Sequence, residues 1–205
     1  MEKYKCQNII TLNWSNDLSV KNLLTKASRM VQPIMIKHKL EVSILSEFYP
    51  SNSSLQGLNN NKGQKIEIRC RNPNNKNELY NLDYIIGTLL HELCHNIHGP
   101  HNSDFYKLLN QFQNELDEFQ SKGIEGTGAG FDMPGQALDT IRHNPISILE
   151  AKNKAANSAE KRLQISKIMG NGKLGGNKTN LTPREAAIMA AEKRLKDSIS
   201  CGNID

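Results

Sequence analysis

Aromatic residues and long hydrophobic runs are scarce in this sequence, and both shortages limit what kind of protein it can be. Aromatic residues make up 5% and hydrophobic residues 37% of the 205 positions. So thin an apolar supply predicts one compact domain over the first ~120 residues, with looser structure after it. No stretch approaches the roughly 18 apolar residues that cross a bilayer. The N-terminal segment MEKYKCQNII also lacks the apolar core of a signal peptide.

Cysteines are few, and none has a close partner in the sequence. The four cysteines are Cys6, Cys70, Cys94 and Cys201. A small disulfide scaffold needs paired, closely spaced cysteines, so this pattern excludes such a framework and indicates a reducing compartment. Together with the missing signal peptide, it predicts a soluble protein of the cytosol or the nucleus.

The net charge of +5 is concentrated in one segment. Residues 142–196 hold 12 Lys and Arg against 4 Asp and Glu, a balance of +8, whereas residues 1–141 hold 14 against 15, a balance of −1. The last nine residues contribute −2. A basic arm beside a nearly neutral domain suits a nucleic-acid-associated enzyme. The alternative is a solvated lysine-rich tail that aids solubility, and charge alone does not separate the two.

The hydrophobic pattern of the first half predicts an α+β domain. Its expected elements are a helix over 17–39 and strands over 41–49 and 65–71, separated by polar loops over 51–63 and 72–77. Pro33 is expected to kink or end the helix. In the second strand Ile66, Ile68 and Cys70 alternate with charged residues, which predicts a half-buried strand.

Two more helices follow in this domain, and the remainder forms an extension. Asn81 can cap a helix over 82–98 that Gly99 and Pro100 end, and another helix with a continuous apolar face covers 102–119. The glycine-rich segment that begins at residue 123 marks the domain edge. We therefore divide the chain into a domain over 1–122 and a Gly-rich joint with a basic helical extension over 123–205. The extension's expected pieces are a weakly amphipathic helix over 145–169, a flexible joint over 170–176, and a helix to about Asp197 that starts with a Thr182 capping box.

The segment HELCHNIHGPH, residues 91–101, carries the strongest chemical signal. His91 and His95 stand four apart, so one turn of helix brings both imidazoles to one ion. The apolar residues of this helix share a sector roughly 180° away from His91, namely Ile86, Leu89, Leu93 and Ile97. The helix is therefore expected to bury one side in the core and to turn both histidines to the opposite, polar side.

A catalytic zinc needs a third protein ligand, for which His98 and His101 compete. On a straight helix His98 lies about 10 Å along the axis from His91, too far to share an ion with both earlier histidines. His101 follows the helix break and stands ten residues after His91, as in the metzincin pattern. We therefore expect His91, His95 and His101 to be the zinc ligands.

Glu92 follows the first ligand, so its carboxylate can take a proton from a water that zinc activates. The reaction class is then hydrolysis of a peptide or isopeptide bond. One alternative is a chance HExxH in a helix, and another is a structural zinc closed by a fourth ligand, often Cys. Cys94 points about 100° away from His95 on the helix, so it is interpreted as a packed residue.

These residues resemble a known family. LLHELCHNIHGPHNSDFYKLLNQF is similar to the signature of the WLM-domain metalloproteases, relatives of the SprT/Spartan-type proteases. The similarity extends through SEFYP, KIEIRCR and IIGTLLHEL upstream, and through GNGKLGG and PREAAIMAAEKR downstream. It implies a minimal zincin-like fold, in which a small sheet packs beside the active-site helix. It also implies Zn²⁺ held by His91, His95 and His101, with Glu92 as the general base. In such folds an edge strand binds extended substrate, and KIEIRCR is the expected edge strand.

The resemblance further implies DNA-dependent proteolysis of proteins crosslinked to or trapped on DNA, with single-stranded or distorted DNA as a partner and the nucleus, and also the cytoplasm, as location. Fungal members of the family carry C-terminal motifs for ubiquitin-like modifiers and for an unfoldase. This chain reaches Asp205 without an acidic-flanked run of Val, Ile and Leu, so those contacts are absent here or lie beyond a truncation. Two alternative functions stay open, an isopeptidase that removes ubiquitin-like modifiers and a DNA-binding or adaptor module with a structural zinc.

Cys201 follows the last expected helix and has two interpretations. We favour a free cysteine near a frayed terminus, because terminal segments are usually mobile. In the other interpretation, its thiolate occupies the open zinc position and keeps the enzyme silent until the tail is displaced.

Overall fold

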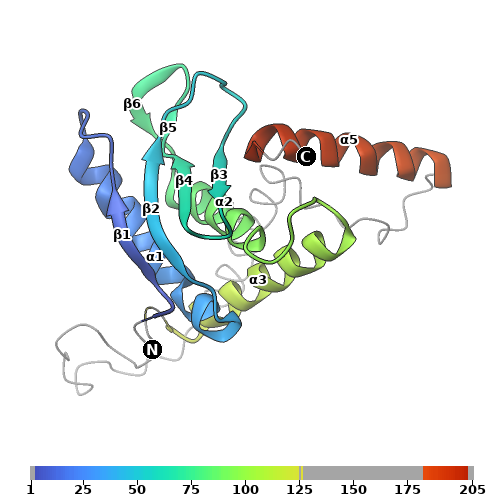
Figure 1. The fold of residues 1–205 in the computed structure, drawn as a ribbon, viewed down its shortest axis with the longest axis horizontal. Coiled ribbons are helices and arrows are strands. Elements are labelled where there is room, and N and C mark those ends of the chain that lie inside the picture. Colours follow the sequence, from blue (N-terminus) through green and yellow to red (C-terminus); the bar gives the residue numbers. More distant parts are fainter. Residues whose placement is uncertain (1–2, 125, 127–181, 203–205) are drawn as a thin grey trace, which may run out of the picture.

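A computed structural model describes residues 3–124, 126 and 182–202 (Figure 1). The strands are β1 (Cys6–Ile10), β2 (Val42–Phe48), β3 (Gly57–Asn60), β4 (Lys65–Arg69), β5 (Arg71–Asn72) and β6 (Asn75–Leu79). The helices are α1 (Asp17–His38), α2 (Leu82–Cys94), α3 (Ser103–Ser121) and α5 (Pro183–Cys201). The predicted α+β class is confirmed. The helix expected over 145–169 and the joint expected over 170–176 lie outside the described residues.

The main sheet has four strands in the order β1-β2-β4-β3. β2 pairs in parallel with both β1 and β4, and β3 runs antiparallel to β4. The expectation that residues 65–71 form the edge strand was therefore wrong, because β4 lies inside the sheet and β3 forms the edge. β3 comes from a segment expected to be a loop. Its sequence GLNN has no hydrophobic alternation, so its strand geometry depends on pairing with β4.

The helices α1 and α2 pack against the sheet and against each other, and α3 packs on both of them (Figure 1). The core between these layers includes Leu24, Val31, Leu45, Ile66, Leu89 and Phe112. Every residue of α2 from Tyr84 to Cys94 is buried, so the side that carries the histidines is covered as well as the side that faces the core. The expected apolar Ile97 is instead 44% exposed, because α2 ends before it. Among the described helices, none is long and apolar enough to cross a membrane.

Two buried arginines correct the expectation of a half-buried strand at 65–71. Arg69 and Arg71 are 0% exposed although they alternate with the apolar residues. Arg71 forms an ion pair with Glu47 at 2.6 Å, and both side chains are fully buried. Arg69 donates hydrogen bonds to the backbone carbonyls of Pro50, Asn52 and Leu55. A buried charge persists only with such partners, and these bonds tie the loop before β3 to the sheet.

Pro33 lies within α1 and does not end it. The helix continues to His38 and stops where Lys39 takes a left-handed conformation with φ 55°. A proline cannot donate to the carbonyl four residues earlier, here that of Arg29. The backbone N–H of Gly126 donates to that carbonyl at 2.9 Å. A segment after α3 therefore satisfies the acceptor that Pro33 leaves, which is one reason the helix tolerates it.

The last helix begins as predicted but runs further. The Thr182 side chain and Glu185 form the expected capping box, and Pro183 occupies the first turn. The helix ends at Cys201, one turn beyond the expected end at Asp197. Figure 1 shows α5 projecting from the body of the molecule, with its C-terminal end beside β3. This end reaches the site described next.

Candidate metal centre

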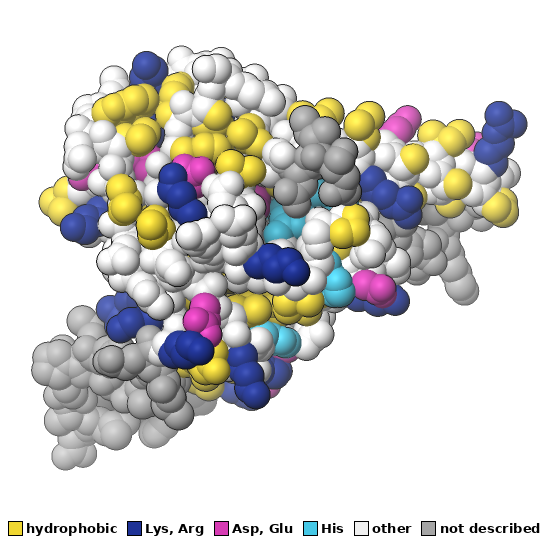
Figure 2. All heavy atoms as spheres, in the orientation of Figure 1, with side chains coloured by type: hydrophobic (Ala, Val, Ile, Leu, Met, Phe, Trp, Pro, Cys, Tyr) yellow, Lys and Arg dark blue, Asp and Glu magenta, His cyan; other side chains and the backbone are white. Residues whose placement is uncertain are grey.

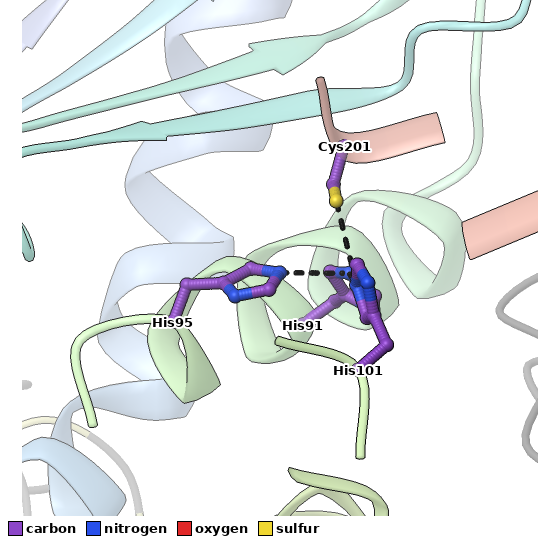
Figure 3. A group of neighbouring side chains, drawn as sticks. All are labelled: His91, His95, His101 and Cys201. Carbon is purple, nitrogen blue, oxygen red and sulfur yellow. Dashed lines mark hydrogen bonds between the residues drawn. The ribbon is translucent and has the colours of Figure 1, made fainter. Parts of the chain in front are cut away.

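Four buried side chains converge at the C-terminal end of α2 (Figure 3). They are His91, His95, His101 and Cys201, and their potential ligand atoms all lie within 4.8 Å of one another. His91 belongs to the last turn of α2, and His95 is the residue that caps it. His101 lies just before α3, and Cys201 is the last residue of α5. Helix α2, the loop after it and α5 therefore supply the group together.

The distances within this group suit a metal ion. The Nε2 atom of His91 lies 3.3 Å from Nε2 of His95 and 3.0 Å from Nε2 of His101. Two nitrogen lone pairs facing each other at such distances repel unless a proton or a cation lies between them. Nitrogens that share a tetrahedral zinc at about 2.0 Å are separated by about 3.3 Å. Three imidazoles and one thiol form a donor set that zinc accepts.

His101, and not His98, joins the group. The side chain of His98 lies outside it, near Asp104. The backbone carbonyl of His98 instead accepts a hydrogen bond from Nδ1 of His95 at 3.0 Å. A proton held on Nδ1 puts the lone pair of His95 on Nε2, the atom that faces His91, and this is the usual orientation of a metal-binding histidine.

Burial keeps the imidazoles in the form that a metal requires. Burial, and then the neighbouring imidazoles, hold the pKa of His91 well below its usual value. Burial, His95 and Lys193 together lower the pKa of His101 to about 4. Both rings are therefore neutral near pH 7, with lone pairs available. Phe105, which sequence analysis assigned only to a core face, packs its ring 4.7–4.9 Å from the centroids of all three histidine rings.

Glu92 is buried beside this group without an ionic partner in the described part of the chain. It is 1% exposed, and burial raises the pKa of its carboxyl well above the usual value. Its Oε2 atom has no hydrogen-bond partner among the described residues. Gly57 of β3 lies directly against the carboxylate. A carboxyl group kept in an apolar place and next to candidate metal ligands is suited to exchanging protons.

Cys201 corrects the interpretation of a free cysteine near a frayed terminus. It is 2% exposed, and its Sγ atom lies 3.4 Å from Nε2 of His101. The chain around it is held to the edge of the sheet, because the N–H of Gln56 donates to the carbonyl of Ser200 at 2.7 Å. Gly202 follows with φ +67° and leaves no room for a side chain beside Leu58. The less favoured interpretation from the sequence, in which the thiol lies at the open metal position, agrees with this contact.

Cys94 behaves as the helical spacing predicts. It lies next to His95 in the sequence but packs in the hydrophobic core and is 0% exposed. Burial raises the pKa of its thiol well above the usual value, so it stays protonated. It is not part of the metal-ligand group.

Comparisons with known proteins agree with this geometry. The WLM domain family model matches residues 4–196. The DNA-dependent metalloprotease WSS1 of Saccharomyces cerevisiae is 30% identical over 183 residues, covering 88% of this chain and 68% of that protein. The DNA-dependent metalloprotease WSS1 homolog 2 of Schizosaccharomyces pombe is 35% identical over 102 residues, covering 47% of this chain and 36% of that protein.

Solved structures show the same fold. The crystal structure of Wss1 from Saccharomyces cerevisiae matches with a TM-score of 0.58 and 31% identity, over 59% of this chain and 95% of that one. The crystal structure of Wss1 from S. pombe matches with a TM-score of 0.51 and 30% identity, over 56% of this chain and 95% of that one. The fold is therefore zincin-like, as predicted, and this chain belongs to the WLM-domain family of metalloproteases.

Proposed function

We propose that this chain is a DNA-dependent zinc endopeptidase that cleaves proteins crosslinked to or trapped on DNA, in the nucleus. The observation that carries the proposal is the convergence of three histidine nitrogens beside the buried carboxyl group of Glu92. The names of the relatives support DNA dependence and proteolysis. The basic segment 142–196 supports a contact with DNA.

In this proposal His91, His95 and His101 hold the zinc ion. When bound, zinc acts as a Lewis acid and makes a water molecule a better proton donor. Glu92 accepts the proton of the attacking water and passes it to the amine that leaves. Burial raises the pKa of Glu92, which makes it a stronger base than an exposed carboxylate. Gly57 holds no side chain over it, so the carboxylate keeps its place.

The described arrangement corresponds to a silent state. With Cys201 as the fourth donor, a tetrahedral ion held by this group would have no position open for water. Helix α5 must therefore leave before hydrolysis begins, and DNA bound to the basic segment 142–196, which includes most of α5, is the proposed trigger. Replacing Cys201 by Ser is expected to raise cleavage in the absence of DNA. Unchanged DNA-free cleavage would show that the thiol does not restrain the enzyme.

The DNA contact has its own test. Figure 2 shows Lys and Arg side chains scattered over the drawn face and not gathered in one patch. By sequence, the excess of positive charge is in the segment 142–196. Replacing Lys152, Lys154, Lys161 and Arg162 by Gln leaves α5 unchanged and removes four charges. Single-stranded DNA should then bind more weakly, and the slope of log affinity against log salt should flatten by up to about 3. An unchanged slope would place the DNA contact elsewhere.

Two other functions are separated by one assay. The closed set of four donors resembles a structural zinc site, which favours a DNA-binding or adaptor module. A structural site, however, has no use for the buried carboxyl group of Glu92. Metal analysis should be combined with cleavage of a DNA-crosslinked protein and of a conjugate with a ubiquitin-like modifier, with and without single-stranded DNA. Cleavage of the conjugate alone would favour the isopeptidase, and cleavage of neither would favour the adaptor.

A further inference from the structure

A second contact joins α5 to the metal centre, next to the one made by Cys201. The hydroxyl group of Tyr106, on α3, donates a hydrogen bond to Oδ2 of Asp197, on α5, at 2.5 Å. Both residues are buried, with 3% and 4% of their surface exposed. A buried hydroxyl needs a partner. While α5 is docked, the partner of the Tyr106 hydroxyl is Asp197 of α5, the helix that must leave before hydrolysis. Neither α3 nor the sheet supplies a partner for it.

The two contacts are made by one face of α5. Asp197 and Cys201 are four residues apart and so lie one above the other on the helix. Cys201 contacts Nε2 of His101, and Asp197 contacts the hydroxyl of Tyr106. One turn earlier, Lys193 lies 4.0 Å above the ring of Tyr106. The Tyr106 hydroxyl and the Cys201 thiol therefore lie on the same side of α5, about one helical turn apart along it. Its ring centroid is 6.4 Å from that of His101.

We propose that the Tyr106 hydroxyl stabilises the oxyanion during peptide hydrolysis and that Asp197 occupies this hydroxyl while α5 is docked. The inference rests on the proposed function, because it assumes that substrate takes the place that Cys201 vacates. A substrate carbonyl in that place would have the hydroxyl about one helical turn away, on the side of the site that α5 vacates. The departure of α5 then opens the site and frees its hydrogen-bond donor in one movement.

A hydroxyl donor here supplements the Lewis acidity that zinc supplies when bound. When water adds to the scissile carbonyl carbon, a carbon–oxygen bond forms, the π electrons move to the carbonyl oxygen, and Glu92 takes the proton of the water. The negative charge on the carbonyl oxygen is stabilised by donors that are already in position. Burial, and then the bond to Asp197, raises the pKa of Tyr106 above its usual value, so the hydroxyl keeps its proton near neutral pH. The group is therefore a donor and not an anion.

The test compares Tyr106→Phe with wild type in the full, zinc-loaded chain with single-stranded DNA. The substitution removes the hydroxyl and keeps the ring that packs under Lys193. We expect kcat to fall by about 10²–10³-fold, with KM and zinc content nearly unchanged. Affinity for a phosphinic peptide, which mimics the tetrahedral oxyanion, should fall at least tenfold by calorimetry. The matched control is Tyr84→Phe, a buried tyrosine at the other end of α2, which should change neither quantity.

The role of Asp197 is measured separately, by cleavage without DNA and by hydrogen exchange of α5. Asp197→Ala should raise DNA-free cleavage and the exchange rate of α5, including in the zinc-free protein. Full kcat and full phosphinic-peptide affinity in Tyr106→Phe would overturn the donor role, even if α5 exchanged faster. Wild-type protein that cleaves nothing with zinc and DNA would overturn the proposed function instead. Phosphinic-peptide affinity would still decide the role of Tyr106 in that case.

Discussion

The absence of a side chain at Gly57 makes room for the carboxylate of Glu92. A Cβ atom at position 57 would lie 2.9 Å from Cγ and Cδ of Glu92, and closer still to Oε1. Such contacts are below van der Waals distance, so one of the two elements, β3 or the Glu92 side chain, would have to move. Strand β3 therefore fixes the place of the carboxylate that we propose as the general base.

Gly57→Ala is therefore expected to lower kcat by 10-fold or more, on the order of the cost of a 1 Å misplacement, and to leave zinc content unchanged. The control is Gly99→Ala, because a Cβ atom at position 99 meets nothing within 4 Å. Cleavage rates and metal content of both variants provide the measurement. Wild-type activity in Gly57→Ala would show that the carboxylate needs no such fixed place.

Loss of His101 should abolish tight zinc binding, whereas loss of His98 should not. His101 contributes its Nε2 atom to the donor group, but His98 contributes only a backbone carbonyl, which substitution by Ala retains. Removing one of three histidine ligands should weaken zinc binding by several orders of magnitude. Competition with a chromogenic chelator measures both affinities. The opposite order of effects would mean that the ligand assignment is wrong.

Glu92→Gln should keep zinc and lose proteolysis. Glutamine has nearly the same shape, but it cannot accept a proton from water near neutral pH. General-base catalysis of this kind contributes about 10²–10⁴-fold. Since burial disfavours the charged form of Glu92, the neutral amide should unfold at the same temperature or higher. A loss of bound zinc would instead identify Glu92 as a ligand.

Removal of the metal should destabilise the protein, and Cys201 should increase the size of the effect. A ligand that binds only the folded state stabilises it by about 4 kcal/mol at 1,000 times its Kd. Because the donors come from α2, the loop after it and α5, zinc should also hold α5 in place. Chelation should lower Tm in wild type by more than in Cys201→Ala. Equal shifts would show that the thiol does not bind zinc.

The pH dependence of the free energy of unfolding should report on the thiol of Cys6. This residue is buried in β1 and is far in the sequence from the candidate metal ligands. Burial raises the pKa of its thiol from 9.0 to about 11. The unfolded chain loses this proton first, so the stabilising contribution is complete below about pH 9 and is lost as the pH rises toward 11. The stability advantage of wild type over Cys6→Ala should therefore shrink between about pH 9 and pH 11 in denaturant titrations. A constant difference would mean that the folded thiol titrates normally.

Local spacing predicted the features whose geometry depends on a few neighbouring residues. Four-residue spacing on one helix brings His91 and His95 together, and a helix break allows His101 to return to them. The caps at Asn81 and Thr182 follow from the same short-range geometry, because a side-chain oxygen reaches only the next turn. These predictions required no knowledge of the tertiary fold.

The sequence alone did not predict contacts between distant segments. The buried pair of Arg71 and Glu47 and the two contacts of α5 at Cys201 and Asp197 join residues 24 to 100 positions apart. The edge position of β3 depends on how its strand pairs with β4. Such contacts depend on which surfaces of the helices and the sheet stay uncovered after these elements have packed together. The hydrophobic periodicity of a single segment does not contain that information. The sequence by itself determined a histidine cluster on one helical turn. Only the tertiary structure decided that α5 closes it, because helix docking depends on the shape of the whole domain.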